Sequence, residues 1–444
     1  MNGTQPTANE RIKRAFEPLS ASEDRFASLE TRIGDAHFVL VGEASHGTHE
    51  FYELRNQITQ QLIRHKGFTA VVVEADWPDA WRVNRYVRNL GDDATASDAL
   101  SGFRRFPQWM WRNTDVVAFV EWLRQWNEST STPVGFYGMD LYSLHGSIAA
   151  VLSYLDKVDP AGAQRARYRY GCFEDYGEDP QAYGYAAGFD LGRSCEDKVL
   201  EQLIELRRRA ADYAQRDGRM AEDEYFYAEQ NARLITNAEH YYRAMFDRRV
   251  DTWNLRDTHM ADTLDALTKY LDEHVGRTKV VVWAHNSHLG DARATETGEG
   301  GQLNVGQLVR ERLPGQSFSI GFTTHDGTVT AASNWDEPAQ LKRVRPSLEG
   351  SYERLFHDAA VDHGILFLNE ETPTREMLLE SRLERAIGVI YRPDTERWSH
   401  YFHAHLPKQF DAVIHIDRTS AVRPLERVAT WHDNEMEETF PSGL

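Results

Sequence analysis

The stretch FVLVGEASHG, residues 38–47, joins four apolar residues to a turn that carries a glutamate and a histidine. The apolar run at 38–41 has the length of a β-strand, and Gly42 ends it. A predicted helix follows, with one apolar face made of Phe51, Leu54, Ile58 and Leu62. The next apolar run, 70–73, contains nothing polar, which is typical of a parallel strand covered on both faces.

The same pattern extends outward along the chain, with a break in the middle. A third apolar run at 134–137 predicts another strand, whereas 146–274 has the periodicity of helices alone. Further strands are predicted at 279–283, 318–322, 365–368, 387–391 and 412–416. Because the helices between these later strands are shorter, we expect some of them to be antiparallel.

The predicted fold class is therefore α/β: a mixed, largely parallel central sheet flanked by helices, with an inserted α-helical subdomain. Residues 1–145 and 275–444 are expected to form the α/β catalytic core, and 146–274 the helical insertion. We expect a cleft between them, because ligands of open α/β sheets bind outside the carboxyl ends of the strands.

The composition excludes several classes of protein. With 41% hydrophobic and 27% charged residues, the 444-residue chain is not disordered as a whole. A mean hydropathy of -0.60 and the lack of a long apolar run argue against a membrane span. The net charge of -19 makes nucleic acid and anionic membranes poor partners, but it says nothing positive about function. The oligomeric state is left open.

The chain has two cysteines, Cys172 and Cys195, which are too few for a disulfide framework. We expect both to be reduced thiols. The segment from Met1 to Glu10 is polar and has no apolar signal region. Together these features predict a cytoplasmic protein.

Ionisable residues follow four of the predicted strands. They are Glu43 and His46 after the first, Glu74 after the second, Asp140 after the third, and His285 with His288 after the strand at 279–283. Any one of them has an ordinary structural explanation, such as an acid near a helix start or a hydrogen-bonded buried histidine. Because burying several ionisable groups without a purpose is costly, the set as a whole favours a functional cleft.

The residue types leave more than one chemistry open. His46 and His49 are three positions apart, as are His285 and His288, so with the carboxylates they could hold zinc. The H-E-x-x-H signature is absent, however, and so are the G-x-S-x-G elbow and the phosphate-binding loop motifs. A metal centre is therefore kept as the alternative.

Three blocks resemble the signature blocks of the erythromycin esterase family: GEASHG at 42–47, EADWP at 74–78 and AHNSH at 284–288. Further stretches support the resemblance, namely FRRFP at 103–107, NLRD at 254–257, NVG at 304–306 and FDAVIH at 410–415. The similarity runs from about residue 30 to 425, with the blocks in order.

The resemblance implies an α/β fold with a helical part and a deep cleft. It also implies hydrolysis of the lactone ester of macrolide antibiotics, which would give resistance, without a metal or other cofactor. The partner that the resemblance implies is a small-molecule ester or lactone substrate. The family's key residues fall on Glu43, His46, Arg55, Glu74 and His285, with His288 as an accessory. Asp140, from the strand ends, is a further candidate for substrate binding.

Lactone opening requires an activated water, a stabilised carbonyl oxygen and a protonated leaving group. A neutral imidazole suits the first task, so we assign it to His285, with Glu74 accepting its other ring N–H. His46, held by Glu43, then polarises the carbonyl or protonates the leaving oxygen. Arg55 pairs with a carboxylate or with the oxyanion. The two histidines could exchange roles.

Two other functions remain open at this point. One is a metal-dependent hydrolase that uses the same histidines and glutamates on a substrate other than a macrolide. The other is a binding protein with a degenerate cleft, although none of the four residues Glu43, His46, Glu74 and His285 is lost. Because no serine elbow is present, we expect water to attack directly without an acyl-enzyme.

Overall fold

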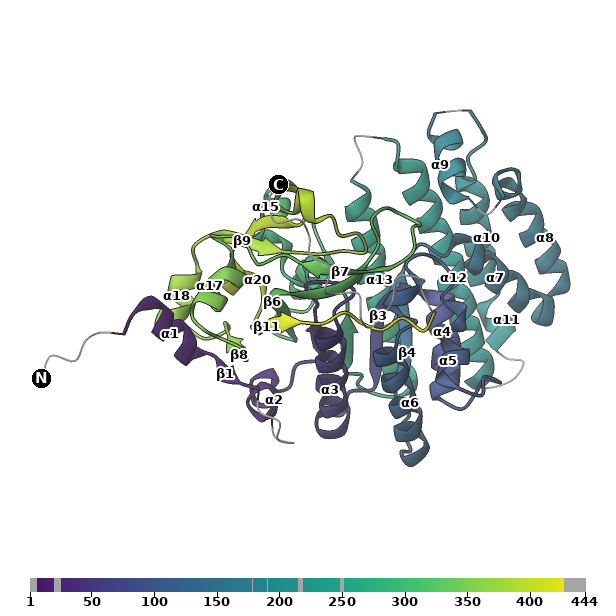
Figure 1. The fold of residues 1–444 in the computed structure, drawn as a ribbon. Helices are drawn as coiled ribbons and strands as arrows, with labels where there is room; N and C mark the ends of the chain where they lie inside the picture. Colours follow the sequence, from purple (N-terminus) through teal and green to yellow (C-terminus); the bar gives the residue numbers. More distant parts are fainter. Residues whose placement is uncertain are drawn as a thin grey trace, which may run out of the picture.

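The computed structural model describes residues 6–19, 25–177, 179–189, 191–214, 219–247 and 251–426. In these ranges the chain forms a nine-stranded mixed sheet flanked by helices (Figure 1). The strand order is β1-β8-β11-β6-β2-β5-β3-β4, and β7 pairs with β6. The predicted α/β fold class is therefore confirmed.

Six neighbouring strands of the sheet are parallel: β11 (Ala412–Thr419), β6 (Ser317–Ala331), β2 (Phe38–Val41), β5 (Val280–Trp283), β3 (Ala70–Asp76) and β4 (Gly135–Asp140). Three strands are antiparallel to their neighbours: β8 (His363–Phe367), β1 (Glu17–Pro18) and β7 (Gln340–Val344). The expectation of some antiparallel strands late in the chain is confirmed. Parallel strands share one carboxyl edge, so the residues that follow β2, β3, β4 and β5 lie together there.

The predicted strand at 387–391 is wrong. In this region β9 (Arg382–Arg385) pairs with β10 (Tyr401–Ala404), while Ile387 forms only an isolated bridge with Ser45. The run is apolar because Ile387 and Tyr391 are buried in a small core cluster with β6 and β7, not because it belongs to a sheet.

The helices before β5 are α1 (Ala8–Ala15), α2 (Ala27–Ile33), α3 (His49–Lys66), α4 (Trp77–Val87), α5 (Ala96–Ala99), α6 (Thr114–Ser129), α7 (Leu144–Val158), α8 (Pro160–Tyr170), α9 (Pro180–Gly188), α10 (Glu196–Arg208), α11 (Ala210–Ala214), α12 (Arg219–Ala244) and α13 (Thr252–His274). After β5 come α14 (Asn286–Leu289), α15 (Glu296–Glu299), α16 (Val305–Arg312), α17 (Tyr352–Asp358), α18 (Pro373–Leu378), α19 (Glu396–Ser399) and α20 (Leu406–Gln409). Short 3-10 turns span Leu100–Gly102, Gln108–Met110, Gly171–Tyr176, Ala292–Ala294 and Pro393–Thr395.

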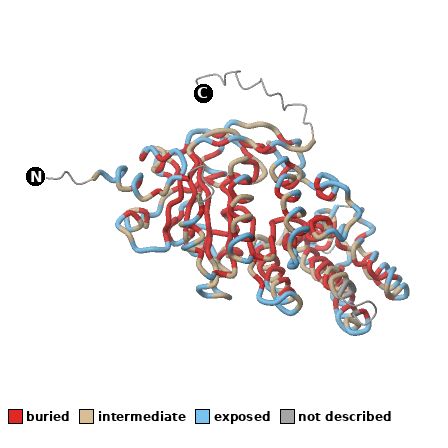
Figure 2. The backbone as a smooth tube through the Cα atoms, turned by 90° about the horizontal axis from the view of Figure 1, so that it is seen from below, coloured by how far each residue is buried: buried red, intermediate tan, exposed pale blue. Residues whose placement is uncertain are grey.

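The helices cover both faces of the parallel strands, which explains why those strands are apolar throughout. Val39 and Val41 of β2 pack in one core with α3 and α6, whereas Phe38 and Leu40 pack in another with α7, α12 and α13. Figure 2 shows the buried backbone running through the central strands, and Figure 1 shows α7 to α12 gathered at the β4 edge. Within the described ranges, no helix has the length and apolar character needed to cross a bilayer. The division into a core and an insertion at 146–274 stays a prediction.

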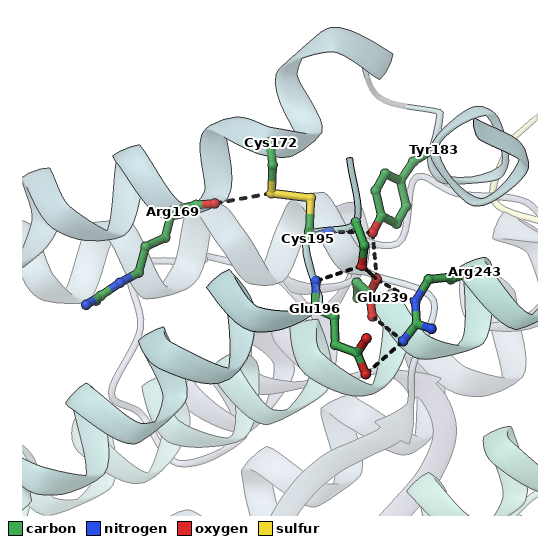
Figure 3. Close-up of a disulfide and its surroundings, with 8 residues drawn as sticks. Arg169, Cys172, Tyr183, Cys195, Glu196, Glu239 and Arg243 are labelled. Carbon is green, nitrogen blue, oxygen red and sulfur yellow. Dashed lines mark hydrogen bonds and ion pairs between the residues drawn. A yellow bond between two sulfur atoms is a disulfide. The ribbon is translucent and has the colours of Figure 1, made fainter. Parts of the chain in front are cut away.

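The expectation of two reduced thiols is wrong, because Cys172 and Cys195 form a disulfide (Figure 3). Helix α8 with its following turn lies beside α10, and Arg169 donates to Glu205 across them at 2.6 Å. This packing brings the two cysteine Cα atoms to 5.9 Å, within the range that a disulfide spans. Cys195 is fully buried, and its N–H donates to the Tyr183 hydroxyl at 2.9 Å. The cytoplasmic location stays a prediction.

We expect the disulfide to resist alkylation in the folded protein and to stabilise the helical region. Closing a loop of this length contributes about 3 kcal/mol to the free energy of unfolding. Mass spectrometry after alkylation should show no modified cysteine before reduction and two after reduction under denaturing conditions. Reductant should lower the melting temperature of the wild type but not that of a Cys172→Ser/Cys195→Ser variant. Free thiols in the unreduced protein would contradict the assignment.

Candidate active site

A pocket of about 420 Å³ lies at the carboxyl edge of the parallel strands. Its floor carries His46, Glu74, Asp140, His285 and His288, each from the residues at or after the end of β2, β3, β4 or β5. Its walls are largely aromatic, made by Phe103, Phe106, Trp111, Tyr142, Trp253, Trp335 and Phe402. The structure thus brings together the strand-end residues that the sequence singled out. Glu43 and Arg55 are buried beside them and do not line the pocket.

His46 is held by a chain of charged groups that runs back into α3. Its Nδ1 lies 2.9 Å from one carboxylate oxygen of Glu43, and the Arg55 guanidinium lies 2.9 Å from the other. Arg55 is fully buried, with its guanidinium 4.3 Å above the Tyr52 ring. Because a carboxylate accepts, Nδ1 of His46 carries the proton, and Nε2 is the nitrogen left for a ligand in the pocket.

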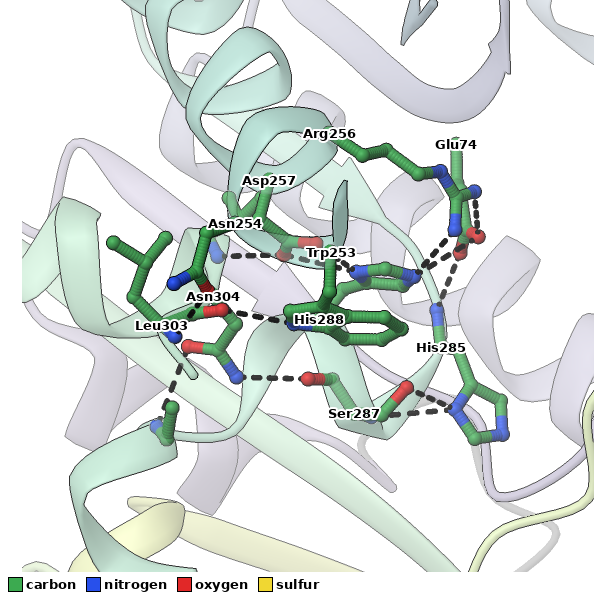
Figure 4. A network of polar contacts seen from close by, with 12 residues as sticks. Glu74, Trp253, Asn254, Arg256, Asp257, His285, Ser287, His288, Leu303 and Asn304 are labelled. Carbon is green, nitrogen blue, oxygen red and sulfur yellow. Dashed lines mark hydrogen bonds and ion pairs between the residues drawn. The ribbon is translucent and has the colours of Figure 1, made fainter. Parts of the chain in front are cut away.

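Glu74 has three polar partners on the floor of the pocket (Figure 4). It accepts from Arg256 at 2.7 Å and from the backbone N–H of His285 at 2.9 Å, and it lies 3.3 Å from Nε2 of His288. Burial acts to raise the pKa of Glu74, but the positive charges around it, led by His288, hold that pKa well below its usual value. Glu74 therefore stays ionised. The predicted bond from Glu74 to the His285 ring is wrong, since Glu74 binds the backbone of that residue.

The His285 ring is held by its own helix turn instead. Its Nδ1 accepts the backbone N–H of Ser287 at 3.2 Å and lies 2.8 Å from the Ser287 hydroxyl. A neutral ring that accepts at Nδ1 carries its proton on Nε2. That Nε2 is buried without a hydrogen-bond partner; the carbonyl of Ala44 is close but falls outside hydrogen-bond geometry. Burial and the neighbouring His46, whose ring centre is 4.9 Å away, lower the pKa of His285 well below its usual value.

The pKa of His288, unlike that of His285, is raised. Its Nδ1 lies 2.9 and 3.0 Å from the two oxygens of Asp257, and the Trp253 ring stacks on it at 4.4 Å. Burial acts to lower the pKa of His288, and Arg256 opposes protonation from 3.1 Å, but Asp257 and Glu74 outweigh both and raise the pKa to about 9. The raised pKa favours the cationic form of His288 at neutral pH, in which both ring nitrogens carry protons.

Several site residues were missed by the sequence analysis. Arg256 donates to both oxygens of Asp140, at 2.9 and 2.7 Å, and its guanidinium lies 4.8 Å above the Tyr142 ring. Asp257, its neighbour on α13, also accepts the backbone N–H of Val305 at 3.1 Å. These residues could have been found from the sequence. Arg256 and Asp257 lie in the stretch 254–257 and Val305 lies in the stretch 304–306, and both stretches carry the family resemblance. The acid Asp76 and its partner Arg105, 2.9 Å apart, likewise come from two of those stretches and line the pocket.

The residues considered as zinc ligands do not converge. His49 points away from the pocket, is half-exposed and pairs with Asp115 at 2.9 Å. Across the described part of the chain, a single group of three such side chains has ligand atoms within 4.8 Å of one another, and it lies elsewhere, at His325, His357 and Asp417. Within the described residues, the candidate zinc ligands at the pocket therefore form no group of three within that distance.

The fold and the pocket define a mixed α/β protein with a cluster of ionisable residues at the carboxyl ends of parallel strands. Comparison with known proteins gives the family. The model of the erythromycin esterase family matches residues 63–419, and the chain belongs to that family of hydrolases.

The similarity to individual relatives is low in identity but extends over nearly the whole chain. The erythromycin esterase type II of Escherichia coli is 22% identical, with 89% of this chain and 93% of that protein covered. The protein YbfO of Bacillus subtilis (strain 168) is 21% identical, with 91% of this chain and 90% of that protein covered.

Solved structures share the fold. A protein from Bacillus cereus superposes with a TM-score of 0.77 at 21% identity, covering 94% of this chain and 98% of that one. An erythromycin esterase mutant in its open conformation superposes with a TM-score of 0.67 at 16% identity, covering 92% of this chain and 97% of that one.

The raised pKa of His288 predicts a pH-dependent stability. A histidine with a raised pKa stabilises the folded state fully below its unfolded pKa of 6.5, and the contribution is lost as the pH rises through about 9. We expect the free energy of unfolding to fall by about 3 kcal/mol across this interval.

Asp257→Asn should remove most of that pH dependence, because it takes away the main charge that stabilises the cation. Asp265→Asn is the matched control on the same helix, since its partner is Arg312 rather than a histidine. Denaturant unfolding at a series of pH values measures the slope of the free energy of unfolding against pH. Equal slopes in the wild type and in Asp257→Asn would contradict the raised pKa.

Proposed function

We propose that the protein hydrolyses an ester or lactone bond by direct attack of a water molecule that His46 activates. One observation carries the proposal: the Nδ1 of His46 is fixed by Glu43, so Nε2 is available in the pocket as a base. An ionised carboxylate beside an imidazole orients the ring and stabilises the imidazolium that forms. Arg55 positions Glu43 from behind by pairing with its other oxygen.

The two histidines then have distinct tasks. The sequence alone favoured His285 as the base, but its Nε2 carries the proton and suits donation. Because that atom is buried in the free protein, the ring has to move when the substrate binds. We therefore place the carbonyl oxygen of the substrate against Nε2–H of His285, where a neutral imidazole can stabilise the negative charge that develops. The two rings are close enough, at 4.9 Å between centres, to act on one ester group.

The reaction can be written without a covalent enzyme intermediate. His46 Nε2 takes a proton from water while the oxygen attacks the carbonyl carbon, which gives a tetrahedral oxyanion. The oxyanion collapses, the carbon–alkoxide bond breaks, and His46 returns its proton to the leaving oxygen. The products are a carboxylic acid and an alcohol, and the enzyme is regenerated. No nucleophilic side chain or metal takes part in these steps.

A macrolide-type macrolactone is the proposed substrate class. The aromatic walls suit a large, mostly apolar ring, and the pocket falls in the volume range of small-molecule sites. The family and the Escherichia coli relative support the same class. If such a drug is hydrolysed, the activity would confer antibiotic resistance.

The proposed activity is tested with metal-stripped protein and a panel of macrolides and simple lactones. We expect at least one macrolactone to gain the mass of one water, at a rate that strong chelators leave unchanged. Loss of turnover with chelator and its recovery with zinc would support the metal-dependent alternative. No hydrolysis of any lactone or simple ester in the panel would contradict the proposed function.

The proposed base is tested by substitution. His46→Ala and Glu43→Gln should each lower kcat by at least about a hundredfold, because the first removes the base and the second the negative charge that stabilises its imidazolium. Added imidazole should partly restore His46→Ala. The control His49→Ala removes a half-exposed histidine outside the pocket and should stay near wild type. Near-normal turnover in folded His46→Ala would overturn the assignment.

A further inference from the structure

A second group of histidines lies on the sheet away from the pocket. His325 is on β6, Asp417 is on β11 and His357 is on α17. Strands β6 and β11 pair in parallel, with Thr324 opposite Ile416, so His325 and Asp417 are cross-strand neighbours. None of the three lines the pocket, and the proposed hydrolysis does not use them.

The three side chains are already in contact. Nδ1 of His357 lies 2.9 and 3.1 Å from the two oxygens of Asp417. The rings of His325 and His357 stack with their centres 3.6 Å apart. One ligand-type atom from each residue lies within 4.8 Å of the others. The group is partly exposed, with about two-fifths of the His357 side chain accessible, so an ion can reach it from solvent.

The charge of Asp417 is compensated in an unusual way. Its ion pairs within the described ranges are both with histidines, His357 and His415, and not with arginine or lysine. Arg418, next in the chain, pairs with Asp326 instead. Imidazole rings can be neutral, so they need not balance the charge of the carboxylate. A bound cation would balance it.

His325 has the kind of supporting contact that metal ligands use. Its Nδ1 lies 2.6 Å from the Ser347 hydroxyl. A metal-bound histidine typically has one ring nitrogen fixed by such a partner, which leaves the other nitrogen, here Nε2, for the metal. In His357 the nitrogen beside the carboxylate is Nδ1, so Nδ1 and an Asp417 oxygen, 2.9 Å apart, are the two atoms that can share an ion.

We propose that His325, His357 and Asp417 form a binding site for a divalent transition metal, with Zn²⁺ as the preferred ion. Two histidines and a carboxylate match the ligand types of zinc. Tetrahedral zinc ligands at about 2.1 Å lie about 3.4 Å from one another, and Nδ1 of His357 and the Asp417 oxygen, 2.9 Å apart, are near that separation. Because the two imidazole rings stack nearly parallel, one of them has to turn before both can face the ion. The ion would tie α17 to β6 and β11, and its role would be structural.

The site is tested by calorimetric titration of ZnCl₂ into the metal-stripped full-length protein without an affinity tag. We expect one equivalent of Zn²⁺ to bind and to raise the melting temperature. His357→Gln and Asp417→Asn should each weaken binding by at least about tenfold. His403→Ala is the matched control, because it removes an exposed histidine of β10 outside the group and should leave binding unchanged.

The outcomes separate this site from the pocket. Zinc binding retained by both variants, or absent from the wild type, would overturn the proposal whatever the activity. Hydrolysis by His357→Gln should equal that of the wild type with and without Zn²⁺, because the group lies outside the pocket. Failure of the lactone assay would leave the calorimetric result fully interpretable.

Discussion

The site depends on the need to compensate one buried carboxylate. Glu74, at the carboxyl half of β3, is almost inaccessible to solvent and ionised, and burying such a charge without partners is prohibitively costly. Its donors come from two distant parts of the chain: the backbone of His285 after β5, and Arg256 on α13. Satisfying Glu74 therefore fixes how α13 and the turn after β5 sit on the carboxyl edge of the sheet.

The same constraint separates the three histidines into different states. Glu74 and Asp257 sit on either side of His288 and keep it charged, so it serves the site as a fixed positive charge. Glu74 accepts the backbone N–H of His285 and does not bind its ring. Burial lowers the pKa of that ring, which keeps it neutral. His46 has a carboxylate of its own, Glu43. A ring fixed at Nδ1, a buried ring with a lowered pKa and a ring with a raised pKa thus lie in one pocket, and the proposed hydrolysis rests on this division.

Much of this arrangement could be predicted from the sequence. Parallel strands share a carboxyl edge, so an apolar run followed by Glu43, Glu74 or His285 was enough to place those residues together. Their hydrogen bonds could not be predicted, because whether Glu74 meets a ring or a backbone N–H depends on the turn geometry. Arg256 and Asp257 lie on a helix far along the chain, and helical periodicity gives a buried face but not its partner. Likewise, the apolar run at 387–391 reflects the burial of its side chains and not membership of a strand. Cys172 and Cys195 are neighbours only because their helices pack together.

The central claim is that the protonation of these three histidines is divided in this way, and NMR of protein with ¹⁵N-labelled histidine tests it without any substrate. We expect Nδ1 of His46 to carry a proton, and at neutral pH we expect His285 to be protonated on Nε2 alone and His288 on both nitrogens. His46→Ala, His285→Ala and His288→Ala variants would assign the signals. A neutral His288, or a His285 protonated on Nδ1 with a free Nε2, would contradict the account.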